Sequence, residues 1–417
     1  MEESVMSDLE GKRVTGASPV ANSIAAKEWG AYIEALAPLG ERLVEKMLNS
    51  DDPQLRQEMY RMLFMGMSTA YMGLFIGDPE YPEFWPIYHH IYNWFAPNPD
   101  DTNTMAPVSG DGVYKISGDR GTVRLVDFQI GAGKFLPLGI GGFGPTLANY
   151  DIDSLNINKE DGKFEVILSP ERPADYAGDW WKLDSTADYI MVRQRAYDWV
   201  NEVDGRFSID RLDRPAIKPR QTEQELKETL GLISVWAENY SNFAIDYLKT
   251  FIDRGLLNKV VVDDLTSRGG LSTQRYINGL FDIKPDEALI YETEVPEQCR
   301  YWNIELLDML FSVIDYVNRQ TSLNGYTARL DKDGKFRAVI SATDPGVPNW
   351  LDTAGYAKGA IFARWTECSS FPTPFVTKVK LADVRKYLPA DTPVVSAEAR
   401  DASLRLRRKG AQLRRRW

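Results

Sequence analysis

The sequence predicts an α+β protein in which an N-terminal helical region precedes two related antiparallel β-sandwich-like modules joined by a long helix. Three observations support this fold class. Apolar residues fall at helical spacing near the N-terminus, they alternate with polar residues from residue 98 onward, and one β-rich pattern occurs twice. The expected parts are a helical region at 1–97, a first β module at 98–212, a linker and long helix at 213–258, a second β module at 259–399 and a basic tail at 400–417.

The N-terminal region carries the first helical signals. Asp52 followed by Pro53 is typical of a helix start, because Asp can cap free amides and Pro fits the first turn. The stretch 81–95 is unusually aromatic and is interpreted as core, with the wall of a pocket as the alternative. Apolar residues recur at helical spacing, with a break at Pro38-Leu39-Gly40, at Trp29, Ile33, Leu36, Leu43, Val44 and Met47.

Turn and strand signals begin at residue 98. Asn98-Pro99-Asp100-Asp101 is rich in turn-forming residues, and Gly118 to Gly121 is expected to separate two strands. Asp161-Gly162 lies between two runs of alternating apolar residues, at 155–157 and 164–168, which predicts a hairpin.

A long helix is predicted to connect the two modules. Pro215 and Pro219 mark a linker, and Thr222 with Glu225 forms a capping-box pattern that opens the helix. The face expected to be buried comprises Leu226, Leu230, Ile233, Ala237, Tyr240, Ala244, Tyr247 and Phe251.

An internal similarity predicts that the two β modules are related. Residues 161–173 read DGKFEVILSPERP and residues 333–345 read DGKFRAVISATDP. Allowing small gaps, the stretch from Trp181 to Ala187 then resembles the stretch from Trp350 to Ala354, and an arginine follows each, Arg193 and Arg364. We therefore expect Gly162 to match Gly334 and the apolar layers of the two modules to pack together.

Composition restricts the class of protein. A chain of 417 residues with a net charge of −11 can hold two or three domains and is disfavoured as a specific nucleic-acid binder. Its 11 Trp, 20 Tyr and 17 Phe suit thick cores or an aromatic cavity. Two cysteines, no long apolar run and an acidic start predict free thiols in a cytoplasmic protein.

No motif for a cofactor or a metal ion stands in a fitting context, so none is predicted. Gly139 to Gly144 has the letters of a dinucleotide-binding loop, but Pro145 follows at once, and a flexible glycine loop is expected instead. The only histidines, His89 and His90, are neighbours and are poorly placed to hold one metal. Any chemistry is expected to use Asp, Glu, Tyr, Arg or Lys.

The tail from Arg400 to Trp417 carries eight Lys or Arg residues against one acidic residue, Asp401. It is expected to form a solvated helix on an acidic protein surface of its own or another subunit, with salt-sensitive contacts. An anionic membrane or nucleic acid is the alternative partner. Assembly into a homo-oligomer is also expected.

The predicted site lies where the two modules meet. If they pack about a pseudo-two-fold axis, Arg193 and Arg364 converge there and need anionic partners. Asp184 and Asp352 are the structural candidates for that role, and the alternative is a ligand carboxylate clamped by the guanidiniums. The substrate-binding residues predicted on that alternative are Arg193, Tyr301, Asn303, Asn324, Asn349, Trp350 and Arg364. Catalytic residues stay unassigned.

The C-terminal part resembles the bacterial family of unknown function numbered 1214, which often occurs with a partner domain numbered 1254. The resemblance rests on Arg300-Tyr301-Trp302-Asn303, on 315–320, on 344–352 and on Arg364-Trp365, and it is strong over 299–417. Residues 98–101 and 193–199 look like the N-terminal half of long members. The family implies β-sandwich-like modules with accessory helices, and it brings no established reaction.

Three functions are compatible with these observations. The first is a cofactor-independent acid–base enzyme, a hydrolase, lyase or isomerase, acting on a hydrophobic hydroxylated or carboxylated small molecule. The second is a non-catalytic carrier or sensor of an apolar small molecule, and the third is a structural oligomer.

Overall fold

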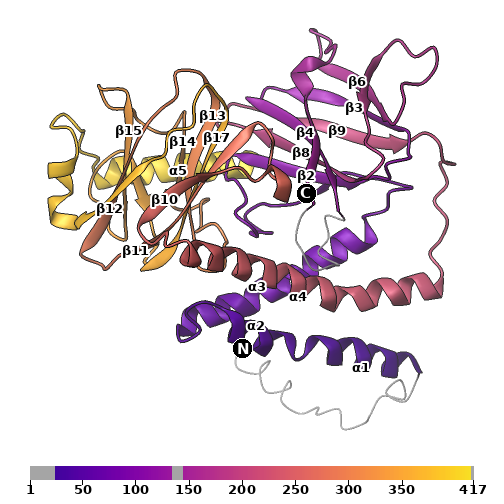
Figure 1. The fold of residues 1–417 in the computed structure, drawn as a ribbon, viewed down its shortest axis with the longest axis horizontal. Helices are drawn as coiled ribbons and strands as arrows, with labels where there is room; N and C mark the ends of the chain where they lie inside the picture. Colours follow the sequence, from indigo (N-terminus) through magenta and orange to yellow (C-terminus); the bar gives the residue numbers. More distant parts are fainter. Residues whose placement is uncertain (1–23, 134–143, 415–417) are drawn as a thin grey trace, which may run out of the picture.

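The computed structural model describes residues 24–133 and 144–414 (Figure 1). The acidic start, most of the glycine loop at 139–144 and the last three residues of the basic tail lie outside the described residues. Two β modules lie side by side, and a layer of helices lies beneath them in the view of Figure 1. In the described part of the chain, no helix combines the length and the apolar character needed to cross a bilayer.

The N-terminal region is helical, as predicted. It contains α1 (Ile24–Leu36), α2 (Leu39–Lys46) and α3 (Pro53–Phe75), with the break at Pro38. The Asp52 side chain caps α3 by accepting hydrogen bonds from the backbone amides of Gln54 and Leu55. The aromatic stretch that follows is largely irregular apart from β1 (Trp85–Pro86), and Trp85 and Trp94 are buried.

The first module consists of a five-stranded and a four-stranded sheet. The five-stranded sheet has the order β1-β2-β8-β4-β5, with β2 (Asp101–Pro107), β4 (Leu125–Ala132), β5 (Thr146–Asp151) and β8 (Ala187–Arg195). The four-stranded sheet has the order β7-β6-β3-β9, with β3 (Tyr114–Gly121), β6 (Lys163–Ser169), β7 (Asp179–Lys182) and β9 (Asp204–Arg211).

The second module repeats this plan. Its five-stranded sheet is β10-β11-β17-β13-β14, with β10 (Lys259–Asp263), β11 (Gln274–Asp282), β13 (Cys299–Leu307), β14 (Ser322–Asn324) and β17 (Lys358–Cys368). Its four-stranded sheet is β16-β15-β12-β18, with β12 (Glu287–Glu294), β15 (Lys335–Ser341), β16 (Trp350–Asp352) and β18 (Phe375–Lys380). In chain order β2 to β9 correspond one to one to β11 to β18, and both modules contain one parallel pair, β6–β7 and β15–β16. The predicted relationship between the modules is confirmed.

The register corrects one detail of the repeat. Gly162 and Gly334 both have a positive φ, of 70° and 77°, in the turn before β6 and β15, as matching glycines should. Counted from these turns, Trp350 pairs with Val339 as Trp180 pairs with Ile167. The counterpart of Trp350 is therefore Trp180, and the predicted match to Trp181 is wrong by one residue.

Two local predictions in the first module are also wrong. Gly118 to Gly121 does not separate two strands but forms the end of β3. A Cβ atom at residue 118 would lie only 1.8 Å from the backbone carbonyl oxygen of Arg206 on β9. Glycine is therefore needed at position 118, where β3 and β9 approach each other closely. Asp161-Gly162 forms a turn, but residues 155–157 are not a strand, and β6 pairs with β3 and β7 instead.

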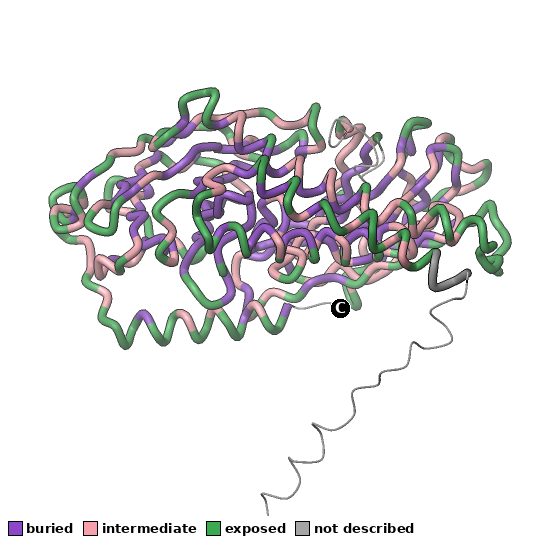
Figure 2. Tube along the Cα trace, turned by 90° about the horizontal axis from the view of Figure 1, so that it is seen from below, coloured by how far each residue is buried: buried purple, intermediate pink, exposed green. Residues whose placement is uncertain are grey.

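The helix α4 (Glu223–Asp253) begins with the predicted capping box of Thr222 and Glu225. Its buried face starts later than predicted, at Trp236, whereas Leu226 and Leu230 are only half-buried. The C-terminal helix α5 (Ala397–Leu413) lies along the edge of the molecule and is mostly exposed, with a few buried residues (Figure 2). Within its own chain, Arg400 pairs with Asp344 of the second module, and Arg414, directly after the helix, pairs with Asp204 of the first.

Candidate functional site

A cavity of about 360 Å³ lies where the five-stranded sheets of the two modules face each other. The first module contributes side chains of β2 and β8, and the second contributes side chains of the corresponding strands β11 and β17. Two residues of α4, Phe243 and Tyr247, and the loop 265–270 complete the wall. The cavity therefore occupies the junction that the repeat predicted.

Aromatic and apolar side chains make up half of the wall. Pockets of this size with convergent polar groups are the usual form of small-molecule sites. The apolar and aromatic lining side chains include Tyr88, Phe95, Tyr189, Met191, Phe243, Tyr247, Tyr276 and Phe362. The aromatic stretch 81–95 thus supplies both core residues and part of this wall, which were the two alternatives for it.

Four arginines line the same cavity: Arg193, Arg195, Arg268 and Arg364. Arg195 is buried and forms a bidentate pair with Asp101, at 2.6 and 2.8 Å. Arg364 is buried as well, 3.0 Å from a carboxylate oxygen of Glu305. These two charges are neutralised by the protein itself.

Arg193 is in a different situation. It is half-buried and donates a hydrogen bond to the neutral side chain of Gln129. Within the described residues no carboxylate lies within 4.0 Å of the Arg193 or the Arg268 guanidinium. Burial raises the pKa of Asp127, the cross-strand neighbour of Arg193 on β4, to about 6, although the Arg193 charge opposes the shift. The cavity thus has an excess of positive charge.

Asp184 and Asp352 do not neutralise the two predicted arginines, so that expectation is wrong. Asp184 accepts hydrogen bonds from Thr186 in a turn, and Asp352 pairs with Arg319 at 2.7 Å. Glu305 takes the role for Arg364. Burial raises the pKa of Glu305 to about 7, although the Arg364 charge opposes the shift.

Three of the other predicted binding residues lie in a buried network behind the cavity. The Tyr301 hydroxyl donates to Asp100 at 2.6 Å, and the Asn324 amide donates to the same carboxylate at 2.8 Å. Asn303 donates to the side-chain oxygen of Asn98, at 3.1 Å, and Asn98 itself lines the cavity. The network holds the wall in place from behind.

Asn349 and Trp350 lie elsewhere and do not line this cavity. The Asn349 amide donates to the backbone carbonyls of Arg329 and Arg337, at 2.6 and 2.8 Å. Trp350 packs in a separate apolar cluster and donates to the carbonyl of Ser341. Of the seven predicted residues, the structure brings only Arg193 and Arg364 to the cavity wall.

Several cavity residues were not predicted from the sequence, among them Arg195 and Tyr276, although a signal for Arg195 was present. Arg195 follows Arg193 by two positions, and alternate residues of a strand share a face, so the pair predicts two guanidiniums on one side. Tyr276 pairs with Arg364 across β11 and β17, and no local pattern marks it. Both side chains line the cavity.

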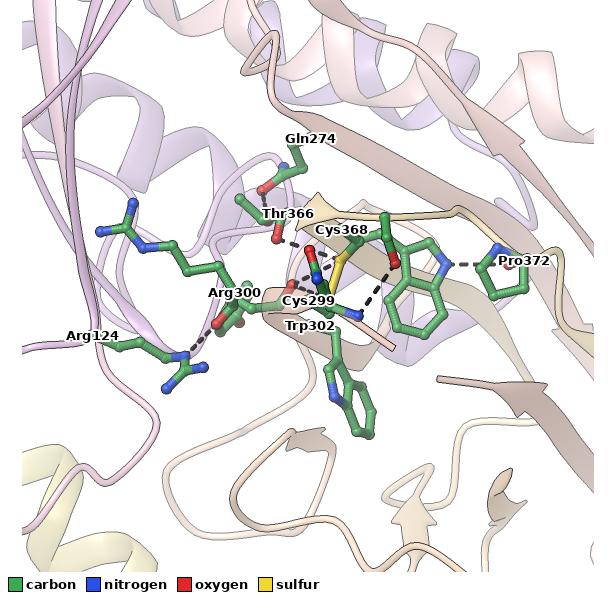
Figure 3. Close-up of a disulfide and its surroundings, with 12 residues drawn as sticks. Arg124, Gln274, Cys299, Arg300, Trp302, Thr366, Cys368 and Pro372 are labelled. Atoms are coloured by element: carbon green, nitrogen blue, oxygen red, sulfur yellow. Dashed lines mark hydrogen bonds between the residues drawn. A yellow bond between two sulfur atoms is a disulfide. The ribbon is translucent and has the colours of Figure 1, made fainter. Parts of the chain in front are cut away.

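The two cysteines are joined, so the prediction of free thiols is wrong. Cys299 of β13 and Cys368 of β17 lie opposite each other in the register, with a Cα–Cα distance of 3.9 Å (Figure 3). Thr366, two residues before Cys368, donates a hydrogen bond to the side-chain oxygen of Gln274 at 2.8 Å, and Figure 3 shows both side chains beside the disulfide. Arg195 donates hydrogen bonds to both Thr366 and Gln274. The disulfide therefore links β13 and β17 close to the buried ion pair of Arg195 and Asp101.

Residues 284–365 match the family described as "Protein of unknown function (DUF1214)". A solved structure of an uncharacterised protein from Burkholderia cenocepacia is similar, with 27% identity and a TM-score of 0.78 over 86% of this chain and 98% of that chain. The VPA0106 protein from Vibrio parahaemolyticus is 14% identical, with a TM-score of 0.45 over 77% of this chain and 98% of its own. No curated protein matches the sequence significantly.

The matched segment contains all four stretches on which the resemblance rested, from Arg300 to Trp365. The similarity of residues 98–101 and 193–199 to the partner domain numbered 1254 stays a prediction. The resemblance to the family numbered 1214 therefore holds for the second module, in which residues 284–365 match the DUF1214 family model.

Proposed function

We propose that the cavity between the modules binds a small organic anion with an aromatic or other apolar body. The observation that carries the proposal is the Arg193 guanidinium, which lines an aromatic cavity and has no carboxylate of the described residues within 4.0 Å. A partly desolvated guanidinium without a counter-charge is costly, and a ligand carboxylate would offset that cost with a planar, bidentate contact. The tyrosine and phenylalanine side chains would cover the rest of the ligand.

The ion pairs within the protein indicate that the ligand carries a single anionic group, because they neutralise two of the four cavity arginines. Arg195 and Arg364 are engaged by Asp101 and Glu305, which leaves Arg193 as the primary anchor and the exposed Arg268 as a second cation of the same wall. The cavity volume, about 360 Å³, is near the lower end of small-molecule sites and suits a one-ring ligand.

Binding alone suits a carrier or a sensor, and one observation favours acid–base catalysis as a second candidate. The Tyr276 side chain lines the cavity, on the strand position paired with Arg364, and a tyrosine hydroxyl there can exchange a proton with a bound ligand. A hydrolase, lyase or isomerase would use such a group without a cofactor. Product analysis by mass spectrometry after incubation with each probe below separates the candidates, because a carrier returns its ligand unchanged.

The Arg193→Gln variant tests the proposal. Titration calorimetry of the full chain with benzoate, phenylacetate and cinnamate is expected to show binding, and their amides are expected to bind far more weakly. The variant is expected to weaken carboxylate binding about 10- to 100-fold, because a hydrogen bond to a charged group is lost.

Arg206→Gln is the matched control, because the Arg206 side chain is 78% exposed and lies outside the cavity. It is expected to bind the probes as the unaltered protein does. Equal affinity of Arg193→Gln and the unaltered protein for every carboxylate, or equal affinity for acid and amide, would contradict the proposal.

A further inference from the structure

A second cavity, of about 580 Å³, lies between α3, the segment 308–319 and the C-terminal helix α5. It shares none of its lining residues with the cavity between the modules. An adjoining cavity of about 640 Å³ shares Glu58, Ala354 and Tyr356 with it. Two buried carboxylates, Glu58 and Asp308, line the second cavity.

Glu58 carries an unused acceptor. The side chain is 8% exposed, and its oxygen Oε1 accepts hydrogen bonds from the Tyr356 hydroxyl at 2.7 Å and from Gln54 at 3.1 Å. The other oxygen, Oε2, is buried and accepts none. A buried carboxylate oxygen without a donor costs free energy, so its presence in a cavity wall indicates a missing donor.

Asp308 provides a second acceptor at the same cavity. It is 4% exposed, and its oxygen Oδ1 accepts hydrogen bonds from the backbone amides of Leu310 and Ser312. Among the described residues no side chain donates to its other oxygen, Oδ2. Burial raises the pKa of Asp308 to about 7, and the nearby negative charge of Glu58 acts in the same direction. A positive charge placed between the two carboxylates would therefore be stabilised.

The arginine side chains that line the second cavity form no ion pairs with Glu58 or Asp308 within the described residues. Arg319 pairs with Asp352 at 2.7 Å, and Arg408 donates to Asn318 at 2.7 Å. Arg61, three residues after Glu58 on α3, is exposed and forms no ion pair with either carboxylate within the described residues, although its charge opposes the rise in the pKa of Asp308. The missing donor is thus not supplied by a neighbouring arginine.

We propose that this second cavity binds a primary alkylammonium group, which donates hydrogen bonds to Glu58 and Asp308. An ammonium ion has three donors and one positive charge, which match two carboxylates with unused oxygens. The described residues contain no group of three or more His, Cys, Asp or Glu side chains arranged to hold a metal ion, which favours an organic cation. Met62, Met65, Leu310 and Val313 line the same cavity and suit an alkyl chain.

The test compares n-pentylamine with 1-pentanol, which has the same chain length and no charge. Titration calorimetry of the full chain at neutral pH is expected to show binding of the amine and none of the alcohol. Glu58→Gln and Asp308→Asn are each expected to weaken amine binding at least about tenfold, because each removes a charged acceptor and keeps the shape. Glu165→Gln, at an exposed glutamate, is the matched control and is expected to bind as the unaltered protein does.

Thermal unfolding separates a binding role from a structural one. Glu58→Gln is expected to keep or raise the melting temperature, because it removes a buried charge with an unpaired oxygen. Lower stability with unchanged amine affinity would show that Glu58 only anchors Tyr356 and would overturn the proposal. So would equal binding of amine and alcohol, or no amine binding at all. Arg193→Gln is expected to bind the amine normally, which keeps this result independent of the carboxylate site.

Discussion

Replacing Arg195 by Met is expected to lower the free energy of unfolding by about 3–5 kcal/mol, because it leaves Asp101 as a buried charge without its partner. Arg195 is 1% exposed and forms a bidentate pair with Asp101. Its Nη1 atom also donates, at 3.0 Å each, to Gln274 and Thr366 of the second module. The guanidinium lies over the ring of Tyr301, 4.3 Å from its centroid, and so contacts both modules.

Urea unfolding of Arg195→Met, Asp101→Leu and the double variant measures this effect. The double variant is expected to be more stable than the sum of the single changes, since an apolar pair can replace a buried ion pair at little cost. Arg206→Met, at an exposed guanidinium that pairs with Asp119, is expected to change stability by less than about 1 kcal/mol. Additive single changes of the Arg195 pair would show that the two side chains do not act together.

Local sequence patterns were sufficient to predict the duplication. The Asp-Gly turns, the capping box at Thr222 and the alternating strands all depend on residues a few positions apart. A turn that needs a positive φ strongly favours glycine, so Gly162 and Gly334 mark equivalent points of the chain. The one-residue error at Trp181 arose after these turns, where gaps in the comparison leave the strand register undetermined.

The site was less predictable because its contacts join distant segments. Asp101 and Arg195 are 94 residues apart, and only the pairing of β2 with β8 places them opposite each other. Cys299 and Cys368 are separated by 69 residues, and the pairing of β13 with β17 brings them together. Arg193 and Arg364 were predictable because each follows a copy of the same pattern. Glu305 is not part of the repeated pattern, so its role beside Arg364 could not be predicted from the sequence.

The C-terminal helix was expected to dock through exposed, salt-sensitive charges, and the structure changes that expectation. Arg400 and Arg414 are buried, and Arg414 donates to the Asp204 carboxylate and to the backbone carbonyls of Asp100 and Gln194. Because Arg400 contacts the second module and Arg414 the first, α5 connects both. Buried pairs are screened much less by salt than exposed ones.

Arg414→Ala is therefore expected to cost about 3–5 kcal/mol of unfolding free energy, because Asp204 stays buried without its guanidinium. The loss is expected to be nearly the same at low and at high sodium chloride concentration. Arg405→Ala is the control on the same helix, since the Arg405 side chain is 71% exposed and water screens its pair with Asp401. Chemical unfolding at two salt concentrations measures both variants. A loss for Arg414→Ala that disappears in high salt would show that α5 is held by surface charge and that the buried contacts to Asp204 contribute little.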